Sequence, residues 1–179
     1  MSDSLKGKRI ALLVNDGFEQ AELTGPKQAL EQAGANTEIL SAKPGQVTGW
    51  HHTTPGDSFN VDKTFDSADI DDYDAIVLPG GVVNADTIRM DEMAQELVKD
   101  AARANKPIAV ICHGAWILAS ADLVKGKTIT SWPSLRDDLE NAGANWVDQE
   151  VVVDGRLISS RKPDDIPAFN QKLIEALAA

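Results

Sequence analysis

The sequence is poor in cysteine and has no long apolar run. Cys112 is the only cysteine among 179 residues, so no disulfide can form within the chain. A fold without disulfides suits a reducing compartment, and we expect a cytoplasmic protein. No segment approaches the ~20 apolar residues of a transmembrane helix, and the N-terminus lacks the long apolar core of a signal peptide. Export and membrane attachment are therefore not expected.

Basic residues are also scarce. The chain has 17 Lys and Arg residues against 28 Asp and Glu residues, which gives a net charge of -11. Such a surface repels a phosphate backbone, so nucleic acid is not an expected partner. A hydrophobic fraction of 42% and a charged fraction of 25% are ordinary for a globular protein. We find no linker, internal repeat or low-complexity tract, and we expect residues 1–179 to form a single domain.

Short β-prone runs alternate with helical patterns along the chain, which is typical of a parallel sheet wrapped by helices. We therefore predict an α/β fold with a mostly parallel central sheet that contains every motif. Expected strands are residues 9–15, 37–41, 74–78, the apolar run before Cys112, and 128–131. Expected helices are a segment that ends near Ala33, residues 91–105, 134–142 and 163–177.

Several local features carry their own expectations. Pro26 removes an amide donor and predicts a kink or a second helix start. Asp154-Gly155 indicates a hairpin between antiparallel edge strands. The segment 43–57, rich in Gly, His, Thr and Pro, is expected to be a loop. Its adjacent histidines, His51 and His52, point different ways and have no other ligands beside them, so we expect neither a metal site nor a cofactor.

Two further expectations concern the buried face of one helix and the exposure of an acidic segment. In the helix at 91–105, the apolar face is expected to consist of Met93, Leu97, Val98 and Ala101. The segment at 62–74 is acidic and is expected to lie on the surface.

The segment around Cys112 indicates a nucleophile elbow. A buried strand must turn sharply at Cys112-His113-Gly114 into an apolar helical segment, and a small residue such as Gly114 is needed for close packing. The first amides of that helix favour a thiolate, so we expect a thiol pKa below the ~8.5 of free cysteine. The alternative is that Cys112 is an inert apolar residue, because free cysteine is often buried.

A second turn with glycine follows the strand at 74–78. Pro79-Gly80-Gly81 suggests a backbone with positive φ whose amides are turned toward a ligand, and it is a candidate oxyanion hole. The alternative is an ordinary tight turn. The neighbouring cysteine strand favours the functional interpretation.

Five segments stand out together: DGFEQAE at 16–22, LPGG at 78–81, AVICHG at 109–114, DD with NAG at 137–143, and EVVVD followed by SSR at 150–161. In combination they resemble the PfpI intracellular protease family of the class I glutamine amidotransferase-like superfamily. Relatives in that superfamily include glyoxalase III and deglycase proteins. The resemblance implies a flavodoxin-like three-layer sandwich with helices on both faces of the sheet.

The resemblance also implies roles for individual residues. Cys112 is the nucleophile, and His113 is the neighbouring acid/base that lends its amide to the oxyanion hole. Gly81 supplies the second amide, and Glu19 corresponds to the family's buried glutamate beside the sulfur. The alternative for Glu19 is an acid at the helix N-terminus that interacts favourably with the positive end of the helix dipole and has no catalytic role. Asp86 matches the triad acid of the protease branch only with one inserted residue, and that acid comes from an adjacent subunit.

Three functions remain open at this point. The first is a stress-related enzyme that attacks small aldehydes or dicarbonyls through a thiol-bound intermediate. The second is an intracellular cysteine peptidase that acts on peptides, and the third is a non-catalytic redox sensor in which Cys112 is oxidised. The resemblance also implies a homo-oligomer, at least a dimer, with an interface close to the Pro-Gly-Gly loop.

Overall fold

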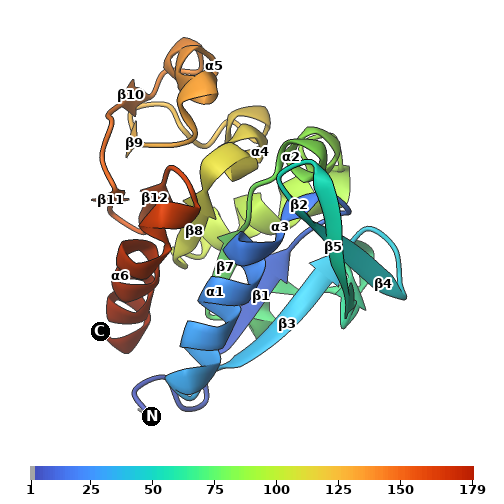
Figure 1. Ribbon diagram of the computed structural model, residues 1–179. Helices are drawn as coiled ribbons and strands as arrows, with labels where there is room; N and C mark the ends of the chain where they lie inside the picture. Colours follow the sequence, from blue (N-terminus) through green and yellow to red (C-terminus); the bar gives the residue numbers. More distant parts are fainter. Residues whose placement is uncertain (1–2) are drawn as a thin grey trace.

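The computed structural model describes residues 3–179, and its centre is a seven-stranded sheet (Figure 1). The strand order is β11-β12-β8-β7-β1-β3-β6. Every neighbouring pair is parallel except β11 and β12, which are antiparallel. The mostly parallel α/β fold is thus confirmed. The bounds are β1 Arg9–Leu13, β3 Asn36–Ser41, β6 Lys63–Thr64, β7 Ala75–Leu78, β8 Ile108–Ile111, β11 Val151–Asp154 and β12 Leu157–Ser160.

Helices cover both faces of this sheet, which gives the three layers of a flavodoxin-like fold. The side chains of β1 alternate: Ile10 and Leu12 join one hydrophobic cluster, and Ala11 and Leu13 join the other. The first cluster includes apolar residues of α1 and α6, and the second includes those of α3 and α4. The bounds are α1 Gln20–Gln32, α2 Val82–Ile88, α3 Glu92–Arg103, α4 Trp116–Ser120, α5 Arg136–Asn141 and α6 Ile166–Ala178.

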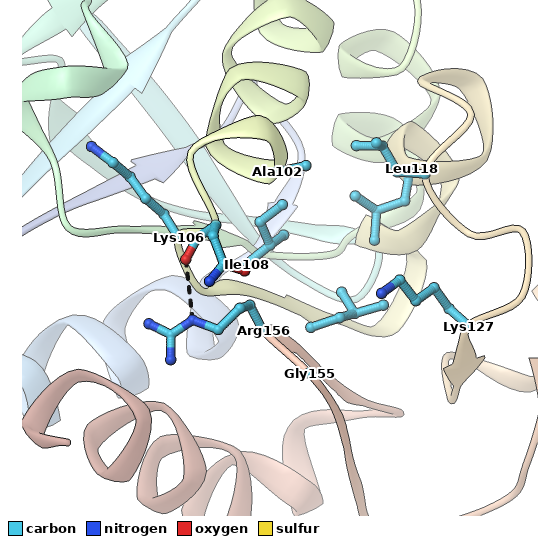
Figure 2. Close-up of a pocket in the computed structure, with 10 residues that line it drawn as sticks. Ala102, Lys106, Ile108, Leu118, Lys127, Gly155 and Arg156 are labelled. Atoms are coloured by element: carbon cyan, nitrogen blue, oxygen red, sulfur yellow. Dashed lines mark hydrogen bonds between the residues drawn. The ribbon is translucent and has the colours of Figure 1, made fainter.

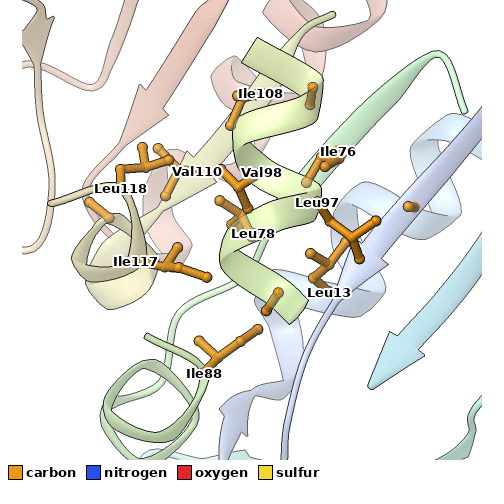
Figure 3. Packing of buried hydrophobic residues seen from close by; sticks show 14 of the residues in the cluster. Leu13, Ile76, Leu78, Ile88, Leu97, Val98, Ile108, Val110, Ile117 and Leu118 are labelled. Carbon is orange, nitrogen blue, oxygen red and sulfur yellow. The ribbon is translucent and has the colours of Figure 1, made fainter. Parts of the chain in front are cut away.

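The buried face of α3 agrees with the expected one at Leu97, Val98 and Ala101, and differs from it only at Met93. Asp91 caps the helix by accepting hydrogen bonds from the amides of Met93 and Ala94. Ala94 is buried, whereas the Met93 side chain is 45% exposed, so the expectation for Met93 was wrong. The buried positions 94, 97, 98 and 101 follow the i, i+3, i+4, i+7 spacing of a single helical stripe. Figure 3 shows Val98 against Leu78 and Val110 of the sheet.

The segment at 43–57 is mostly a hairpin rather than the expected loop. Strands β4 (Gln46–His51) and β5 (Thr54–Asn60) pair antiparallel, and β4 also pairs with the short strand β2 (Phe18–Glu19). The hairpin has few β-branched residues, and tertiary bonds support it: the Gln20 amide group donates to the Asp57 carboxylate and accepts from the Asp57 amide. A third sheet joins β9 (Thr128–Ile129) to β10 (Asn145–Trp146). The motifs are therefore spread over three sheets.

The structure also tests the expectations for Pro26 and for the Asp154-Gly155 turn. Pro26 lies inside the continuous helix α1 and does not start a second helix. It is buried, as are Leu23 and Leu30 of the same helix. The hairpin at Asp154-Gly155 is confirmed, but only β11 is an edge strand, since β12 pairs with β8 on its other side. Among residues 3–179, no helix is both long and apolar enough to cross a bilayer.

Candidate active site

Cys112 stands at a sharp turn between the end of β8 and a 3-10 turn that leads into α4. Its φ angle of 62° lies in the left-handed region, which costs a non-glycine residue about 1–3 kcal/mol. Gly114 permits the turn, because a Cβ there would lie 2.5 Å from the Leu78 carbonyl oxygen and 2.9 Å from that of Pro79. The geometry is that of a nucleophile elbow, in which local strain presents the thiol at the carboxyl edge of the sheet.

Two backbone amides converge on the sulfur of Cys112. They belong to His113 and Gly81, and both lower the pKa of the thiol. Gly81 has a φ angle of 87° and directly precedes α2, so its amide is turned toward the elbow by a conformation that favours glycine. The same amides can stabilise an oxyanion that forms when sulfur attacks a carbonyl carbon.

The glutamate beside the sulfur is Glu22, whereas the sequence analysis expected Glu19. Glu22 lies in the first turn of α1, is fully buried, and accepts a hydrogen bond from the Gly80 amide at 2.8 Å. Its other oxygen, Oε2, has no conventional hydrogen-bond partner among the described residues, and the carboxyl interacts with the Cys112 thiol. Burial raises the pKa of Glu22 to about 8, although the Gly80 amide acts in the opposite direction. At neutral pH this carboxyl therefore holds its proton.

The expectation of a low thiol pKa is also wrong for this arrangement. Cys112 is only 7% exposed. Burial and the negative charge of Glu22 raise the pKa of its thiol above the ordinary range, against the lowering effect of the two amides. From the sequence, only the helix N-terminus beside Cys112 could be predicted, and its amides lower the thiol pKa. The sequence does not show that a buried carboxyl lies beside the sulfur and raises that pKa.

His113 is the nearest base for the thiol proton. Its Nδ1 atom lies 3.3 Å from Sγ of Cys112, and burial lowers the pKa of the imidazole, so the ring is neutral at neutral pH. The ring is stacked on Trp132 and meets Trp116 edge-on, at centroid distances of 5.8 and 5.4 Å. These two indoles fix the orientation of the ring.

Glu19 and Asp86 differ in their position relative to the cleft that contains Cys112. The Glu19 carboxylate accepts a hydrogen bond from the His52 amide at 3.0 Å, and it lines the same cleft as Cys112. Asp86 is exposed on α2 and does not line that cleft. Within one chain, Asp86 is therefore not part of the site.

The cleft above the thiol has a volume of about 290 Å³. Val82, Trp132 and Pro163 give it an apolar wall, and Trp132 is 39% exposed there. Pro163 is held in place because the Arg161 guanidinium donates two hydrogen bonds to the buried Asp165 carboxylate, at 2.9 and 3.0 Å. Among residues 3–179, no group of three His, Cys, Asp or Glu side chains is arranged to hold a metal ion.

Asn84 is a positioning residue that the sequence analysis missed. It is fully buried on α2, and its side-chain amide donates to the carbonyl oxygens of Pro79 and Gly80 at 3.2 and 2.9 Å. Its carbonyl oxygen accepts from the Asn15 amide at 2.7 Å. One side chain thus ties the loop after β1 to the Pro-Gly-Gly turn that orients Gly81. Its only sequence signal is a polar residue just after that turn.

Comparisons with known proteins agree with this geometry. The sequence profile of the DJ-1/PfpI family matches residues 8–176. A protein of Bacillus subtilis (strain 168) named "Putative cysteine protease YraA" is 42% identical over 95% of this chain and 98% of its own. A protein of Pyrococcus furiosus named "Deglycase PfpI" is 41% identical over 94% of this chain and 99% of its own.

Solved structures show the same fold. The structure of Schizosaccharomyces pombe DJ-1 superposes with a TM-score of 0.85 at 28% identity, and the match covers 96% of this chain and 92% of that protein.

Proposed function

Because the chain belongs to the DJ-1/PfpI family, we propose that it is a cysteine-dependent enzyme that attacks small aldehydes and dicarbonyls, as a glyoxalase or deglycase does. The observation that carries the proposal is the pairing of Cys112 with the protonated, buried carboxyl of Glu22. An acid that keeps its proton to about pH 8 can take part in proton transfer at neutral pH. The proposed role is the removal of reactive carbonyls under stress, and the proposed location is the cytoplasm.

The first step joins sulfur to the substrate. Sγ of Cys112 adds to the aldehyde carbon of a dicarbonyl while Nδ1 of His113 takes the thiol proton. The carbonyl oxygen becomes an oxyanion that the amides of Gly81 and His113 stabilise, and it then gains a proton to give a hemithioacetal. An oxyanion-hole donor of this kind contributes roughly 3 kcal/mol to the transition state.

The second step is an internal oxidation and reduction that needs no other reagent. A proton leaves the carbon bonded to sulfur and a proton is added to the neighbouring ketone carbon. At the same time the hydroxyl of the hemithioacetal loses its proton and the former ketone oxygen gains one, with Glu22 and His113 as the groups that exchange these protons. The product is a thioester of a 2-hydroxy acid. Water then attacks the thioester carbon, the carbon–sulfur bond breaks, and the thiol regains its proton. For methylglyoxal the released acid is lactate.

A cysteine peptidase is the second candidate, favoured by the 42% identical relative with a protease name. His113 beside the thiol suits that chemistry, but the described residues provide no carboxylate that accepts a hydrogen bond from its ring. A carboxylate from another subunit, such as Asp86, would remove this objection.

Product analysis separates the two candidates. The purified protein, incubated with methylglyoxal, is expected to produce lactate by proton NMR, and Cys112→Ser should abolish the signal. Denatured polypeptide is tested in parallel with the same variant. Cleavage of polypeptide that depends on Cys112, together with no lactate, would make the peptidase the better assignment.

A further inference from the structure

A second cavity lies at the other end of β8 from the thiol (Figure 2). It has a volume of about 410 Å³, which is within the range of small-molecule sites. Ile108, at the start of β8, contributes to it, whereas Cys112 follows the end of that strand. The cavity is therefore separate from the active-site cleft. Its apolar lining is formed by Ala102, Ile108, Leu118, Leu123 and Leu157.

The polar lining of this cavity is basic. Lys106, Lys127 and Arg156 line it, and no Asp or Glu residue does. The Lys106 amine is already engaged, because it donates to the carbonyl oxygens of Ile70 and Tyr73 at 2.7 and 2.6 Å. Nε of Arg156 donates to the Asn105 carbonyl oxygen at 3.2 Å, which leaves the terminal nitrogens of the guanidinium for another acceptor.

Lys127 and Arg156 are the two cations available to a ligand. Within residues 3–179, neither forms an ion pair with a carboxylate. The carboxylate of Asp154, just before the turn that carries Arg156, accepts a hydrogen bond from the Thr128 amide and does not line the cavity. Figure 2 shows the Lys127 amine directed along the cavity wall between its apolar side chains.

This lining contrasts with the rest of the chain. A net charge of -11 repels anions over most of the surface, whereas a hollow with two unpaired cations and no acid attracts them. An apolar wall beside the cations selects for a ligand with both an apolar body and a single charge. We propose that this cavity binds a small amphipathic carboxylate, with its alkyl or aryl part against Leu118 and Leu157 and its charge paired with Lys127. The Arg156 guanidinium, which is turned toward the Asn105 carbonyl oxygen, adds positive charge at the other end of the cavity (Figure 2).

Titration with hexanoate tests the site directly. Chemical-shift changes in a ¹H–¹⁵N spectrum are expected to saturate at Lys106, Ile108, Lys127 and residues 155–157, and not at Gly81 or Cys112. Hexylamine and 1-hexanol have the same chain with the opposite charge or none, and both should bind at least about tenfold more weakly, as expected for loss of a charge-assisted hydrogen bond. No saturable change with hexanoate, or equal binding of hexylamine, would refute the proposal.

Variants assign the binding to this cavity. Lys127→Gln should weaken hexanoate binding by about tenfold, and Arg156→Gln, which removes a more distant charge, should weaken it by less. Lys125→Gln removes the same charge from an exposed residue outside the lining and should leave affinity unchanged. Ala102→Leu fills the cavity from an exposed helical position and should abolish binding, while Cys112 alkylation stays at the parental rate. Equal affinity in all four variants would contradict the assignment.

Discussion

Glu19 and Glu22 are one helical turn apart, yet their environments differ completely. Glu19 precedes α1, and its carboxylate accepts a hydrogen bond from the His52 amide. Glu22 lies on the buried side of the helix together with Leu23 and Pro26. The acidic segment in the sequence identifies the right region of the chain. It does not identify which acid reaches the thiol, because that depends on where α1 begins and which of its sides faces the sheet.

Asn84 provides a prediction at the same scale. Asn84→Ala removes three hydrogen bonds and leaves the Pro79 and Gly80 carbonyl oxygens and the Asn15 amide without this partner. Each buried group that loses its partner costs about 1–3 kcal/mol, so urea unfolding should show a loss of at least that size. Lactate formation should fall as well, because Gly81 is no longer held.

Thr87→Ala is the matched control for Asn84. Thr87 is on the same helix but exposed. Its hydroxyl donates to the backbone carbonyl oxygen of Asn84 at 3.1 Å and accepts a long hydrogen bond from the Asn15 side-chain amide at 3.5 Å. Its loss should cost less than about 1 kcal/mol. If the two variants had equal stability and equal activity, the positioning role of Asn84 would have to be abandoned.

At the scale of elements, the elbow depends on close contact between the turn after β8 and the end of β7. Gly114→Ala would place a Cβ against two backbone carbonyl oxygens that cannot move aside easily. We expect a loss of about 1–3 kcal/mol in unfolding free energy and a change in the alkylation rate of Cys112. Both are measured by urea titration and by mass spectrometry after iodoacetamide treatment.

Gly126→Ala controls for backbone strain. Gly126 has a φ angle of 77° and open space around it, so alanine there meets strain but no clash. Its stability should decrease by about 1–2 kcal/mol while the alkylation rate of Cys112 stays unchanged. An unaltered alkylation rate in Gly114→Ala would show that this glycine does not shape the elbow.

The elements of the central sheet could be predicted because their sequence pattern is strong. Runs such as the apolar segment before Cys112 are buried on both faces, and the Asp154-Gly155 turn has few alternatives. The β4–β5 hairpin could not be predicted in this way, since its polar strands are held by β2 and by the bonds between Gln20 and Asp57. Cys112 and the Pro-Gly-Gly turn follow from turn chemistry, and the roles of His113 and Gly81 follow from the family resemblance. Glu22 and Asn84 depend on helix orientation.

For the whole molecule, the burial of Glu22 should make stability depend on pH. The folded chain keeps the Glu22 proton to about pH 8, whereas the unfolded chain loses it near the ordinary value of 4.5. The contribution of this group to the unfolding free energy is therefore complete below about pH 4.5 and decreases up to about pH 8, by on the order of a few kcal/mol. Glu31 and Glu38, whose pKa values are lowered, titrate below this window. His113, whose pKa is lowered by burial from 6.5, acts in the opposite direction within it, so the effect of Glu22 is read from the difference between the parental protein and Glu22→Gln.

Urea unfolding at several pH values measures this effect. Parental protein should lose stability from about pH 5 to 8, and Glu22→Gln, which cannot titrate, should lose less. Glu19→Gln is the control and should follow the parental curve. Parallel curves for the parental protein and Glu22→Gln would contradict the raised pKa.

Assembly is a second property of the whole molecule. Exposed apolar side chains gather on and after α2, next to the Pro-Gly-Gly turn, and Met90 among them is 71% exposed. We expect at least a dimer by light scattering at micromolar concentration, and Met90→Glu should shift it toward the monomer. Val153→Glu, at an edge-strand position that is 50% exposed, should leave assembly intact. A monomeric parental protein would remove Asp86 as a residue supplied by a neighbouring subunit.

The central claim is that Glu22 acts on Cys112 in two ways: its charge opposes thiolate formation, and its proton serves the reaction. Measuring both alkylation and lactate formation in Glu22→Gln tests this claim most directly. Without the carboxylate, the pH midpoint of Cys112 alkylation by iodoacetamide should move to lower pH, because the charge that raises the thiol pKa is gone. Lactate formation from methylglyoxal should nevertheless decrease by roughly 10²-fold or more, because the proton-transfer group is lost. Glu19→Gln should change neither quantity strongly. An unchanged alkylation midpoint in Glu22→Gln, with normal lactate formation, would contradict the account.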